Sequence, residues 1–585
     1  MQALINPFLF PSDIFMHHVL PLCSREFLLA SKRYADTCFW LLFGDPRFSH
    51  HSPTSVLHWA SKNGHLAVVE RLLQNDRVDL IAADCPAIVA ASTGGHQEIV
   101  IRLLQDYRVD PSVGFNYAII VASKNGHLEV VEKLLQDHRV DPSVGFNNAI
   151  VVASENGHPE VVERLRQDYR VDPSEADNYA IRRASENGHL AVVERLLQDD
   201  RVDPSADSNY AIRMASQYGH LAVVERLLKD DRVDPSASDN YAIVVASENG
   251  HLAVVERLLQ DNRVDPSAIN NYAIRLASEN GHLAVVERLL QDYRVDPSAS
   301  DNYAIRRASE RGHLAVVERL LQDDRVDPSA DSNYAIRMAS TYGHLAVVER
   351  LLQDSRVDPS ASDNYAIRRA STYGHPAVVD RLLRDSRVDP SVGDNYVIRM
   401  ASDNGCLEVV ERLLQDSRVD PSADSNYAIR VASANGHLAV VERLLQDDRV
   451  DPSARENYAI RWASQYGHVA VVDRLLRDSR VDPSVGDNYA IRMASENGHL
   501  AAVERLLQDD RVDPSAVVNH AIRWASQCGH LAVVERLLQD DRVDPSASDN
   551  YAIRVASVYG HVAVVDRLLK DSRVQVQQNA LVSKL

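Results

Sequence analysis

Histidine is the residue type whose spacing in this chain could support chemistry, because imidazole nitrogens bind metal ions and carry protons. A Gly-His pair recurs every 31 residues from His65 to His561, and Cys406 fills the one position of that series without a histidine. Zinc binds imidazole nitrogen at about 2.0–2.1 Å, whereas helices packed in successive repeats lie about 8–10 Å apart. Consecutive histidines therefore cannot share a metal ion, so we predict no metal site and interpret each histidine as stabilising a turn.

Other patterns that carry chemistry do not occur in the sequence. There is no phosphate-binding loop, no dinucleotide-binding glycine motif, no H-E-x-x-H and no nucleophile elbow. The His-His pairs at 17–18 and 50–51 have no cysteine or acidic cluster at ligand spacing, and we interpret them as surface residues. We therefore expect a protein that is not an enzyme and that uses no cofactor.

The net charge of the chain limits its partners. The 585 residues include 83 acidic and 63 basic ones, which leaves a formal net charge of -20. Such a surface repels nucleic-acid phosphate and anionic lipid, so we expect neither as a partner. The five cysteines follow no spacing, which indicates a reducing compartment. The sequence shows no signal peptide and no apolar run of about 18 residues, so we expect a cytoplasmic protein, and a monomer.

Each repeat begins with a short helical pattern that is rich in small residues, for example residues 177–187. Asp177 and Asn178 open this segment, and we expect them to act as N-caps because such side chains accept hydrogen bonds from the first turn. Small apolar residues at i, i+1 and i+4 then give one narrow apolar face. Gly188 supplies a left-handed residue that ends the helix without a Cβ penalty.

A second helical pattern, residues 189–199, follows this glycine, with apolar residues on one side and charged residues on the other. We expect Asp203-Pro204 to end it, since the residue before a proline is pushed out of the helical region. Helices of about ten residues do not persist alone in water, so each pair must be covered by the next pair. The sequence therefore predicts an all-α solenoid of stacked helical repeats.

The segment "LHWASKNGHLAVVERLL" (57–73), with its many variants, resembles the ankyrin repeat. In that family a first helix of small residues, a Gly-His turn and a Val-Val-x-x-Leu-Leu second helix follow in this order. The Gly-His spacing divides residues 54–574 into seventeen repeats. Their period of 31 is shorter than the usual period of about 33, and Tyr-Ala-Ile-Arg stands where the family has Thr-Pro-Leu-His. The resemblance implies an ankyrin-type solenoid that binds other proteins.

Two positions on the first helix vary between repeats, namely the residue before Ala-Ser and the residue before Gly-His. They are four positions apart and so share one helix face. We call these two positions, followed from repeat to repeat, the variable stripe. In ankyrin-type stacks this face lines the concave groove, so the resemblance implies contact with a protein target. The candidate residues are Trp462, Tyr466, Met493, Trp524, Arg369, Tyr373, Met338 and Tyr342.

The aromatic and methionine residues of the variable stripe have two interpretations. Trp462, Met493 and Trp524 occupy successive repeats and would form an apolar strip about 20 Å long. Trp, Tyr and Met are frequent anchors of protein interfaces. Alternatively, these side chains fill gaps between neighbouring first helices, and the sequence leaves both interpretations open.

An arginine precedes the first stripe residue in twelve repeats, from Arg182 to Arg554, where the family has histidine. This column could be a basic rail for an acidic partner, or each arginine could bond loop carbonyls and the aspartates of adjacent turns. The regularity of the column and the negative net charge favour the structural role. The pairs Arg306-Arg307 and Arg368-Arg369 are the better candidates for contact with a ligand.

Residues 1–53 lack the repeat and resemble an F-box. "FPSDIF" (10–15) matches its start, "VLPL" (19–22) its middle and "FLLASKRYADTCF" (27–39) its third helix, with Phe for the first Leu and Tyr for the usual Trp. The resemblance implies a substrate receptor of a cullin–RING ubiquitin ligase that binds a Skp-type adaptor. The adaptor-binding residues would be Pro11, Ile14, Leu20 and Leu28. The alternative is a helical cap that closes the stack.

The expected organisation is an F-box-like or capping segment at 1–53, ankyrin-like repeats at 54–574 and a tail at 575–585. Near-identical repeats are common in ankyrin-rich proteins of large DNA viruses and their protist hosts, and a viral origin would imply the host cytoplasm. The favoured function is a ubiquitin-ligase substrate receptor that holds its target in the groove. The alternative function is a plain binding scaffold without a role in ubiquitin transfer.

Overall fold

The computed structural model describes residues 53–74, 78, 80 and 87–575. The regular elements in these residues are α-helices, and the described chain contains no strand, so the predicted all-α fold is confirmed. The chain divides into two compact units, residues 1–277 with 284–295 (unit 1) and residues 278–283 with 296–585 (unit 2). Across the described residues, none of the helices has the length and apolar character needed to cross a bilayer.

In the described part of unit 1, the first helix of each repeat is followed by a second one. The first helices are α4 (Pro53–Lys62), α6 (Ala87–Thr93), α8 (Val113–Lys124), α10 (Val144–Glu155), α12 (Glu175–Glu186), α14 (Ala206–Gln217) and α16 (Ala237–Glu248). The second helices are α5 (Leu66–Leu73), α7 (Gln97–Leu104), α9 (Leu128–Gln136), α11 (Pro159–Arg166), α13 (Leu190–Leu196), α15 (Leu221–Leu227) and α17 (Leu252–Leu259). Helices α18 (Ala268–Glu279) and α19 (Leu283–Leu290) follow at the division between the units.

Unit 2 repeats the same pairing. Its first helices are α20 (Ala299–Arg311), α22 (Ala330–Thr341), α24 (Ala361–Thr372), α26 (Val392–Asp403), α28 (Ala423–Ala434), α30 (Ala454–Gln465), α32 (Val485–Glu496), α34 (Ala516–Gln527) and α36 (Ala547–Val558). Its second helices are α21 (Leu314–Leu320), α23 (Leu345–Leu351), α25 (Pro376–Leu383), α27 (Leu407–Leu414), α29 (Leu438–Leu444), α31 (Val469–Leu476), α33 (Leu500–Leu506), α35 (Leu531–Leu538) and α37 (Val562–Leu569).

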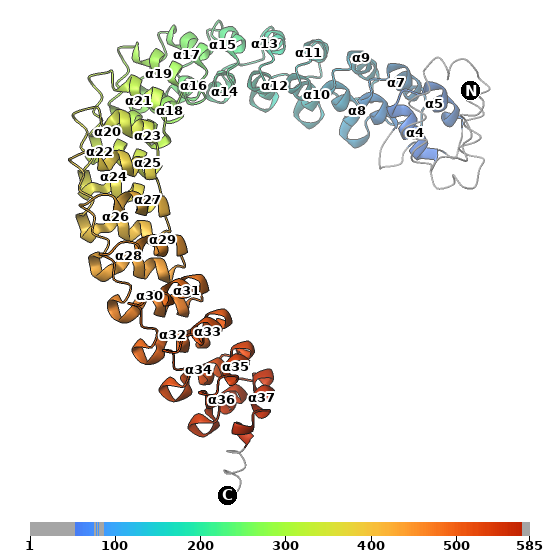
Figure 1. The fold of residues 1–585 in the computed structure, drawn as a ribbon. Coiled ribbons are helices and arrows are strands. Elements are labelled where there is room, and N and C mark those ends of the chain that lie inside the picture. Colours follow the sequence, from blue (N-terminus) through green and yellow to red (C-terminus); the bar gives the residue numbers. More distant parts are fainter. Residues whose placement is uncertain (1–52, 75–77, 79, 81–86, 576–585) are drawn as a thin grey trace, which may run out of the picture. The chain divides into compact units, whose positions relative to one another are not determined.

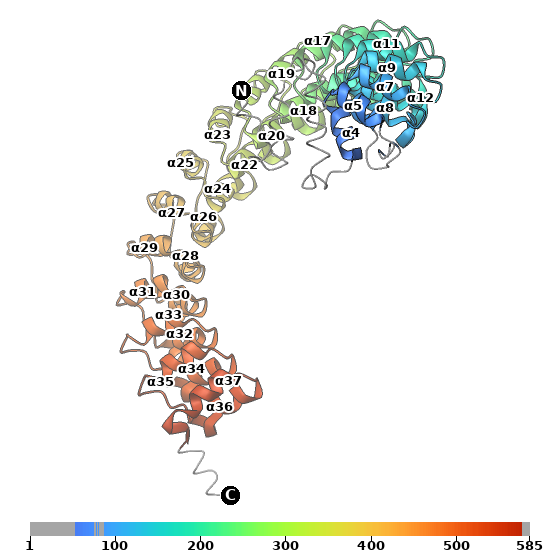
Figure 2. The ribbon, with the colours of Figure 1, turned by 90° about the vertical axis from the view of Figure 1, so that its right-hand side faces the viewer.

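The core of each unit lies between two rows of helices. Figure 1 shows the rows in unit 1, from α4 to α17, and Figure 2 shows them in part of unit 2, from α22 to α29. Within α4–α17 and within α20–α37, each first helix packs on the next first helix, and each second helix packs on its own first helix and on the next second helix. Small residues such as Ala180 and Ala184 bring the first helices close, while Val193 and Leu196 fill the space between the rows, and all four are at most 1% exposed. Stacking therefore buries the apolar side chains that a single short helix pair would leave exposed.

The start of each first helix differs from the expectation of a simple N-cap. In α12, Ala176, Asp177 and Asn178 adopt left-handed φ and ψ angles, and no side chain caps the helix. The Oδ1 atom of Asn178 instead accepts a hydrogen bond from the backbone N–H of Asp203 in the next turn (2.7 Å). The N-cap prediction was therefore wrong, because the amide of Asn178 stabilises contact between turns. Asparagine suits this position since it tolerates the left-handed region.

The second helices end earlier than predicted. Helix α13 stops at Leu196, before Asp203-Pro204 is reached. The carboxylate of Asp199 accepts hydrogen bonds from the backbone N–H of Arg201 (3.1 Å) and from its guanidinium (3.0 and 2.8 Å). The same guanidinium donates to the carbonyl of Val171 in the preceding repeat (3.1 Å). An Asp-x-Arg clamp therefore ends the helix and joins two repeats, so the prediction that the proline ends the helix was wrong.

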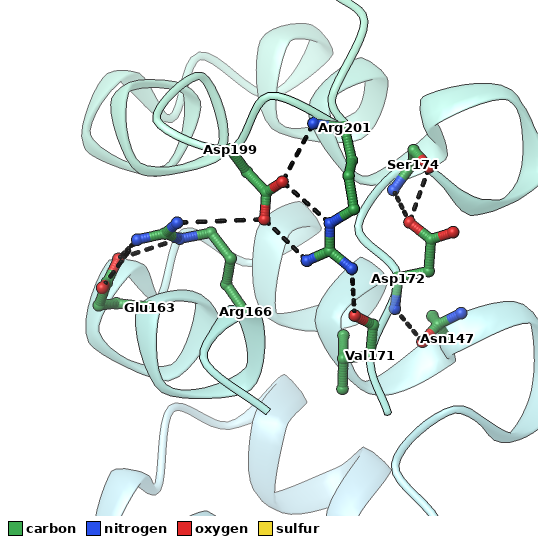
Figure 3. A network of polar contacts seen from close by, with 8 residues as sticks. All are labelled: Asn147, Glu163, Arg166, Val171, Asp172, Ser174, Asp199 and Arg201. Atoms are coloured by element: carbon green, nitrogen blue, oxygen red, sulfur yellow. Dashed lines mark hydrogen bonds and ion pairs between the residues drawn. The ribbon is translucent and has the colours of Figure 1, made fainter. Parts of the chain in front are cut away.

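Figure 3 shows how these turn contacts form a network between neighbouring repeats. Beside the Asp199–Arg201 clamp, the backbone N–H of Asp172 donates to Oδ1 of Asn147 (2.9 Å). The carboxylate of Asp172 in turn accepts hydrogen bonds from the N–H and hydroxyl groups of Ser174 (3.0 and 2.7 Å). The Asn, Asp and Ser residues of the repeat thus recur because each bonds a specific group in a turn.

The histidine of the Gly-His pair reaches back to the preceding repeat. The Nε2–H group of His220 donates to the carbonyl of Glu186 (3.0 Å). Gly188 adopts a φ of 78°, and a Cβ atom there would lie 2.5 Å from Nδ1 of His220. The same bond, at 2.9–3.0 Å, is made by His96, His127, His158, His189, His251, His313, His344, His375, His437, His530 and His561. The turn-stabilising interpretation is confirmed.

The arginine column also joins neighbouring repeats. Its ion pairs with the next repeat include Arg182–Asp207 (2.7 Å), Arg306–Asp331 (3.2 Å) and Arg399–Asp424 (3.6 Å). The guanidinium of Arg182 also lies over the ring of Tyr210, 4.4 Å from its centroid. The favoured structural role of the column is therefore confirmed for these members.

Candidate protein-binding surface

The variable stripe runs along the first helices of unit 2. Met338 lies on α22, Arg369 on α24, Trp462 on α30, Met493 on α32 and Trp524 on α34, and all five are half-buried. Tyr342, Tyr373 and Tyr466 follow the ends of their helices and are 55%, 51% and 49% exposed. Each repeat thus presents one partly covered side chain and one exposed one, four residues apart on a helix face.

Three aromatic rings lie in a row along α30 and the residue that follows it. The centroid of Trp462 lies 5.1 Å from that of Tyr458 and 5.3 Å from that of Tyr466. These distances are typical of favourable aromatic pairs. Because Tyr458, Trp462 and Tyr466 are spaced at i, i+4 and i+8, they form a ridge along the helix. The structure therefore brings the predicted Trp462 and Tyr466 together.

Helix α34 carries a second stacked pair. The ring of Trp524 lies 5.4 Å from that of His520, with an interplanar angle of 25°. Burial lowers the pKa of His520 to about 4, and the nearby Arg492 and Arg523 add to the effect. His520 is therefore neutral near pH 7, and the pair presents an uncharged aromatic surface. Helix α32, which carries Met493, packs against both α30 and α34, so Met493 occupies the same register between the two tryptophans.

The stripe is more polar on α24. The guanidinium of Arg369 lies 5.7 Å from the ring centroid of Tyr365 and 4.5 Å from that of Tyr373. It also donates a hydrogen bond to the Tyr373 hydroxyl group. Stacking on both rings holds the arginine on the surface of its own helix, where its remaining N–H groups can donate to a partner. Of the predicted residues, Arg369 and Tyr373 are thus also in contact.

In two other repeats the stripe residue before Ala-Ser is an arginine that forms ion pairs within the protein. Arg183 on α12 contacts Glu155 (2.6 Å) and Glu186 (2.7 Å), and the hydrogen bond to Glu155 raises its pKa. Arg307 on α20 contacts Glu310 at 2.5 Å. Neither arginine needs a ligand to satisfy its charge. In unit 2, tryptophan stands at this stripe position on α30 and α34, with Met493 of α32 between them.

The chemistry available at this surface is that of binding. Within the described residues, no cluster of three or more His, Cys, Asp or Glu side chains is arranged to hold a metal ion. Sequence reasoning missed two members of the surface, Tyr458 and His520, each four residues before a tryptophan. The helical i, i+4 spacing was the signal that could have found them.

The adaptor-binding candidates lie outside the described residues. Pro11, Ile14, Leu20 and Leu28 precede residue 53, where the described chain begins. The F-box resemblance and its alternative, a capping segment, therefore remain predictions.

The sequence matches the model of one known protein family. The family model "Ankyrin repeats (3 copies)" matches residues 27–115, 87–177, 119–208, 181–270, 212–301, 243–332 and 397–487. Together these ranges cover more than half of the chain, and the first begins within residues 1–53. No curated protein matches the sequence.

Proposed function

The chain belongs to the ankyrin-repeat family, whose repeats are scaffolds for protein–protein interaction, and we propose that its variable stripe binds a protein target. The proposed contact surface is the part of the stripe on α30, α32 and α34. Tyr466 and Trp462 would anchor the target at one end of this surface and Trp524 at the other. Met338, Tyr342, Arg369 and Tyr373 would extend the contact along α22 and α24.

The ridge of Tyr458, Trp462 and Tyr466 carries this proposal. These rings pack against their own helix, and Tyr466 is 49% exposed although a folded chain has no need of an exposed aromatic there. At the same position other repeats carry asparagine or cysteine, so stacking alone does not require an aromatic residue. Large, rigid aromatic side chains are the typical anchors of protein interfaces, because they bury much area at little entropic cost.

We further propose that the chain is a substrate receptor for a cullin–RING ubiquitin ligase in the cytoplasm. In this proposal residues 1–53 form the F-box-like unit, residues 54–574 form seventeen repeats, and residues 575–585 form a tail. Pro11, Ile14, Leu20 and Leu28 would bind a Skp-type adaptor. The chain would catalyse no step itself, and would raise the effective concentration of a target lysine near a charged conjugating enzyme.

The target-binding proposal is tested by affinity purification with the full chain and a Trp462→Ala/Trp524→Ala variant. We expect the variant to recover at least about tenfold less of each protein that the wild-type chain retains, because the variant lacks both anchors. A Tyr107→Ala/Tyr169→Ala variant is the control, since these tyrosines are 90% and 92% exposed but lie outside the stripe. Equal recovery with all three chains would contradict the proposed surface.

The ubiquitin-ligase proposal is tested by titrating a purified Skp-type adaptor into the full chain. We expect binding that is lost in an Ile14→Asp/Leu20→Asp variant and kept in the Trp462→Ala/Trp524→Ala variant. An adaptor that does not bind the wild-type chain would rule out the receptor role. The alternative, a plain binding scaffold capped by residues 1–53, would then stand, because target capture through the stripe does not depend on the adaptor.

A further inference from the structure

Two phenylalanines in unit 1 occupy positions that neither folding nor the variable stripe explains. Phe115 is 83% exposed and Phe146 is 72% exposed. Both lie in the left-handed turn at the start of a first helix, Phe115 with φ 58° and ψ 51° on α8 and Phe146 with φ 59° and ψ 49° on α10. A bulky residue is unfavourable in this region of φ and ψ, and an exposed aromatic ring gains no burial energy.

The thirteen repeats that follow carry small or polar residues at this position, with Val518 as the one exception. Their residues are Asp177, Ser208, Asp239, Asn270, Asp301, Ser332, Asp363, Asp394, Ser425, Glu456, Asp487, Val518 and Asp549. Short polar side chains suit a left-handed turn because they bond the local backbone. The two phenylalanines therefore replace better turn formers in two consecutive repeats.

The segments around both phenylalanines lack the charged residues of other repeats. Residues 111–121 and 142–152 contain no charged residue, whereas the equivalent residues 173–183 contain four. Ile120 and Val151 stand at the register of the arginine column and are buried, 9% and 7% exposed. In these two repeats an uncharged surface thus replaces the Arg–Asp ion pair that joins other repeats. This surface extends from the buried Ile120 and Val151 to the exposed phenylalanine rings.

Carboxylates border this uncharged surface. Asp110 and Asp141 are exposed at the base of the two turns, and Glu175 and Asp177 are exposed on the next one. A hydrogen bond from the Ser143 hydroxyl group lowers the pKa of Asp141, so it is ionised at neutral pH. Two apolar anchors bordered by negative charge are complementary to an apolar segment with basic flanks.

We propose that Phe115 and Phe146 form a second protein-binding surface, which takes a basic amphipathic helix whose apolar residues recur every seven positions. Neighbouring repeats are about 8–10 Å apart, and seven residues of an α-helix rise about 10.5 Å on one face. An extended peptide fits less well, since residues three apart span about 10 Å but point to opposite sides. The surface is distinct from the aromatic stripe on α30 to α34, so the two can hold different partners.

The test uses the full chain and a labelled synthetic alanine–lysine helix with leucine at every seventh position, followed by fluorescence anisotropy. We expect the Phe115→Asp/Phe146→Asp variant to bind this helix about tenfold more weakly, or worse, because both anchors are lost. The substitution adds negative charge and would strengthen non-specific attraction of a basic peptide, so weaker binding reports the anchors alone. Aspartate is the commonest residue at this register, and an unchanged circular dichroism spectrum checks that the variant folds.

Three controls complete the test. A Val517→Ser/Val518→Asp variant makes the matching change on α34 and should bind as the wild type does. A Glu175→Gln/Asp177→Asn variant should bind a few-fold more weakly, and a peptide with glutamate for lysine should not bind. The proposal is overturned if the phenylalanine variant binds the helix as tightly as the wild type. It is also overturned if the wild-type chain binds neutral phosphatidylcholine vesicles through these residues but not the peptide, which would indicate a membrane surface.

Discussion

The turns between repeats and the variable stripe are built from neighbouring residues but follow different rules. Tyr218 and His220 lie two positions apart at the end of α14. The ring of His220 bonds the carbonyl of Glu186 in the preceding repeat, whereas Tyr218 is 49% exposed. Histidine recurs at its position, and the position of Tyr218 holds asparagine, tyrosine, glycine, arginine or cysteine in other repeats. The turn histidine, which bonds a backbone carbonyl of the preceding repeat, is kept. The stripe residues vary, and where one of them reaches another repeat, as Arg183 does with Glu155, the contact is particular to that repeat.

Cys406 shows how far the constant turns tolerate change. It replaces the repeat histidine, and its Sγ atom lies 4.0 Å from the carbonyl of Thr372, where a histidine would donate a full hydrogen bond. Gly374 keeps a φ of 76° although the side chain above it is smaller than in other repeats. One weakened contact among many is therefore compatible with the stack, which is expected when stability is a sum over neighbouring interfaces.

Acidification should have the largest effect, because it breaks the same clamp in most repeats at once. Hydrogen bonds from Arg201 lower the pKa of Asp199 below its ordinary value of 3.8. The stabilisation by this carboxylate is therefore complete above that value and is lost as the pH falls through the lower, folded-state pKa. Burial also lowers the pKa of His313 below 6.5, so protonation of this histidine removes stability as the pH falls below that value. Thermal unfolding followed by circular dichroism should show a shallow decline below pH 6.5 and a steep one below pH 3.8.

The adjacent residues Asp199 and Asp200 separate the clamp from general charge effects. At neutral pH, Asp199→Asn should lower the local free energy of unfolding by about 1 kcal/mol, since it leaves Arg201 without its carboxylate. Asp200→Asn, at an exposed position, should change it by less than about 0.5 kcal/mol. For the acidification experiment, a thermal midpoint that rises as the pH falls below 3.8 would show that the Asp-x-Arg clamps do not stabilise the turns.

Substitution of the turn glycines should have the next largest effect. Gly219 has a φ of 76°, and a Cβ atom there would lie 2.6 Å from Nδ1 of His251. Gly219→Ala should therefore lower the local free energy of unfolding, measured by amide hydrogen exchange of α14 and α15, by about 2–3 kcal/mol. Gly560 has a φ of 77° but no atom within 4 Å of such a Cβ, so Gly560→Ala should cost only about 1 kcal/mol. Equal losses would mean that the next histidine does not constrain the glycine.

Restoring the missing histidine should have a smaller, stabilising effect. Cys406→His should add the hydrogen bond to the carbonyl of Thr372 and raise the local stability of α26 and α27 by about 1 kcal/mol. Cys406→Ser is the control, because serine is too short to replace the ring. If hydrogen exchange shows no gain for the histidine variant, the hydrogen bonds of the repeat histidines contribute less to stability than their geometry indicates.

The fold could be predicted because its determinants are periodic. The 31-residue spacing of Gly-His and the small and Leu/Val positions led to helix pairs that the structure contains, and the family match supports the assignment. The turns could not be predicted in the same way. Asn178 has the residue type of an N-cap, but its bond partner is the backbone of Asp203, which adjoins it only after stacking. Likewise, Asp199 and Arg201 end α13 through a carbonyl of another repeat.

The candidate surface could be predicted in part. Trp462 and Tyr466 lie on one helix face because i, i+4 spacing is a local property, and the structure places their rings together. Whether an arginine at the stripe is free depends on residues of another repeat, as the contact of Arg183 with Glu155 shows. The exposure of Phe115 could not be predicted from its residue type, because the left-handed turn that turns it outward appears only in the structure.

The most direct measurement compares His220→Ala with Tyr218→Ala in the full chain by amide hydrogen exchange of α12 to α15. We expect His220→Ala to lower the local free energy of unfolding by about 1–2 kcal/mol, because it leaves the part-buried carbonyl of Glu186 without this donor. Tyr218→Ala should change it by less than about 0.5 kcal/mol, as is usual for an exposed side chain. Equal losses, or a larger loss for Tyr218→Ala, would contradict the separation of constant turns from a variable stripe.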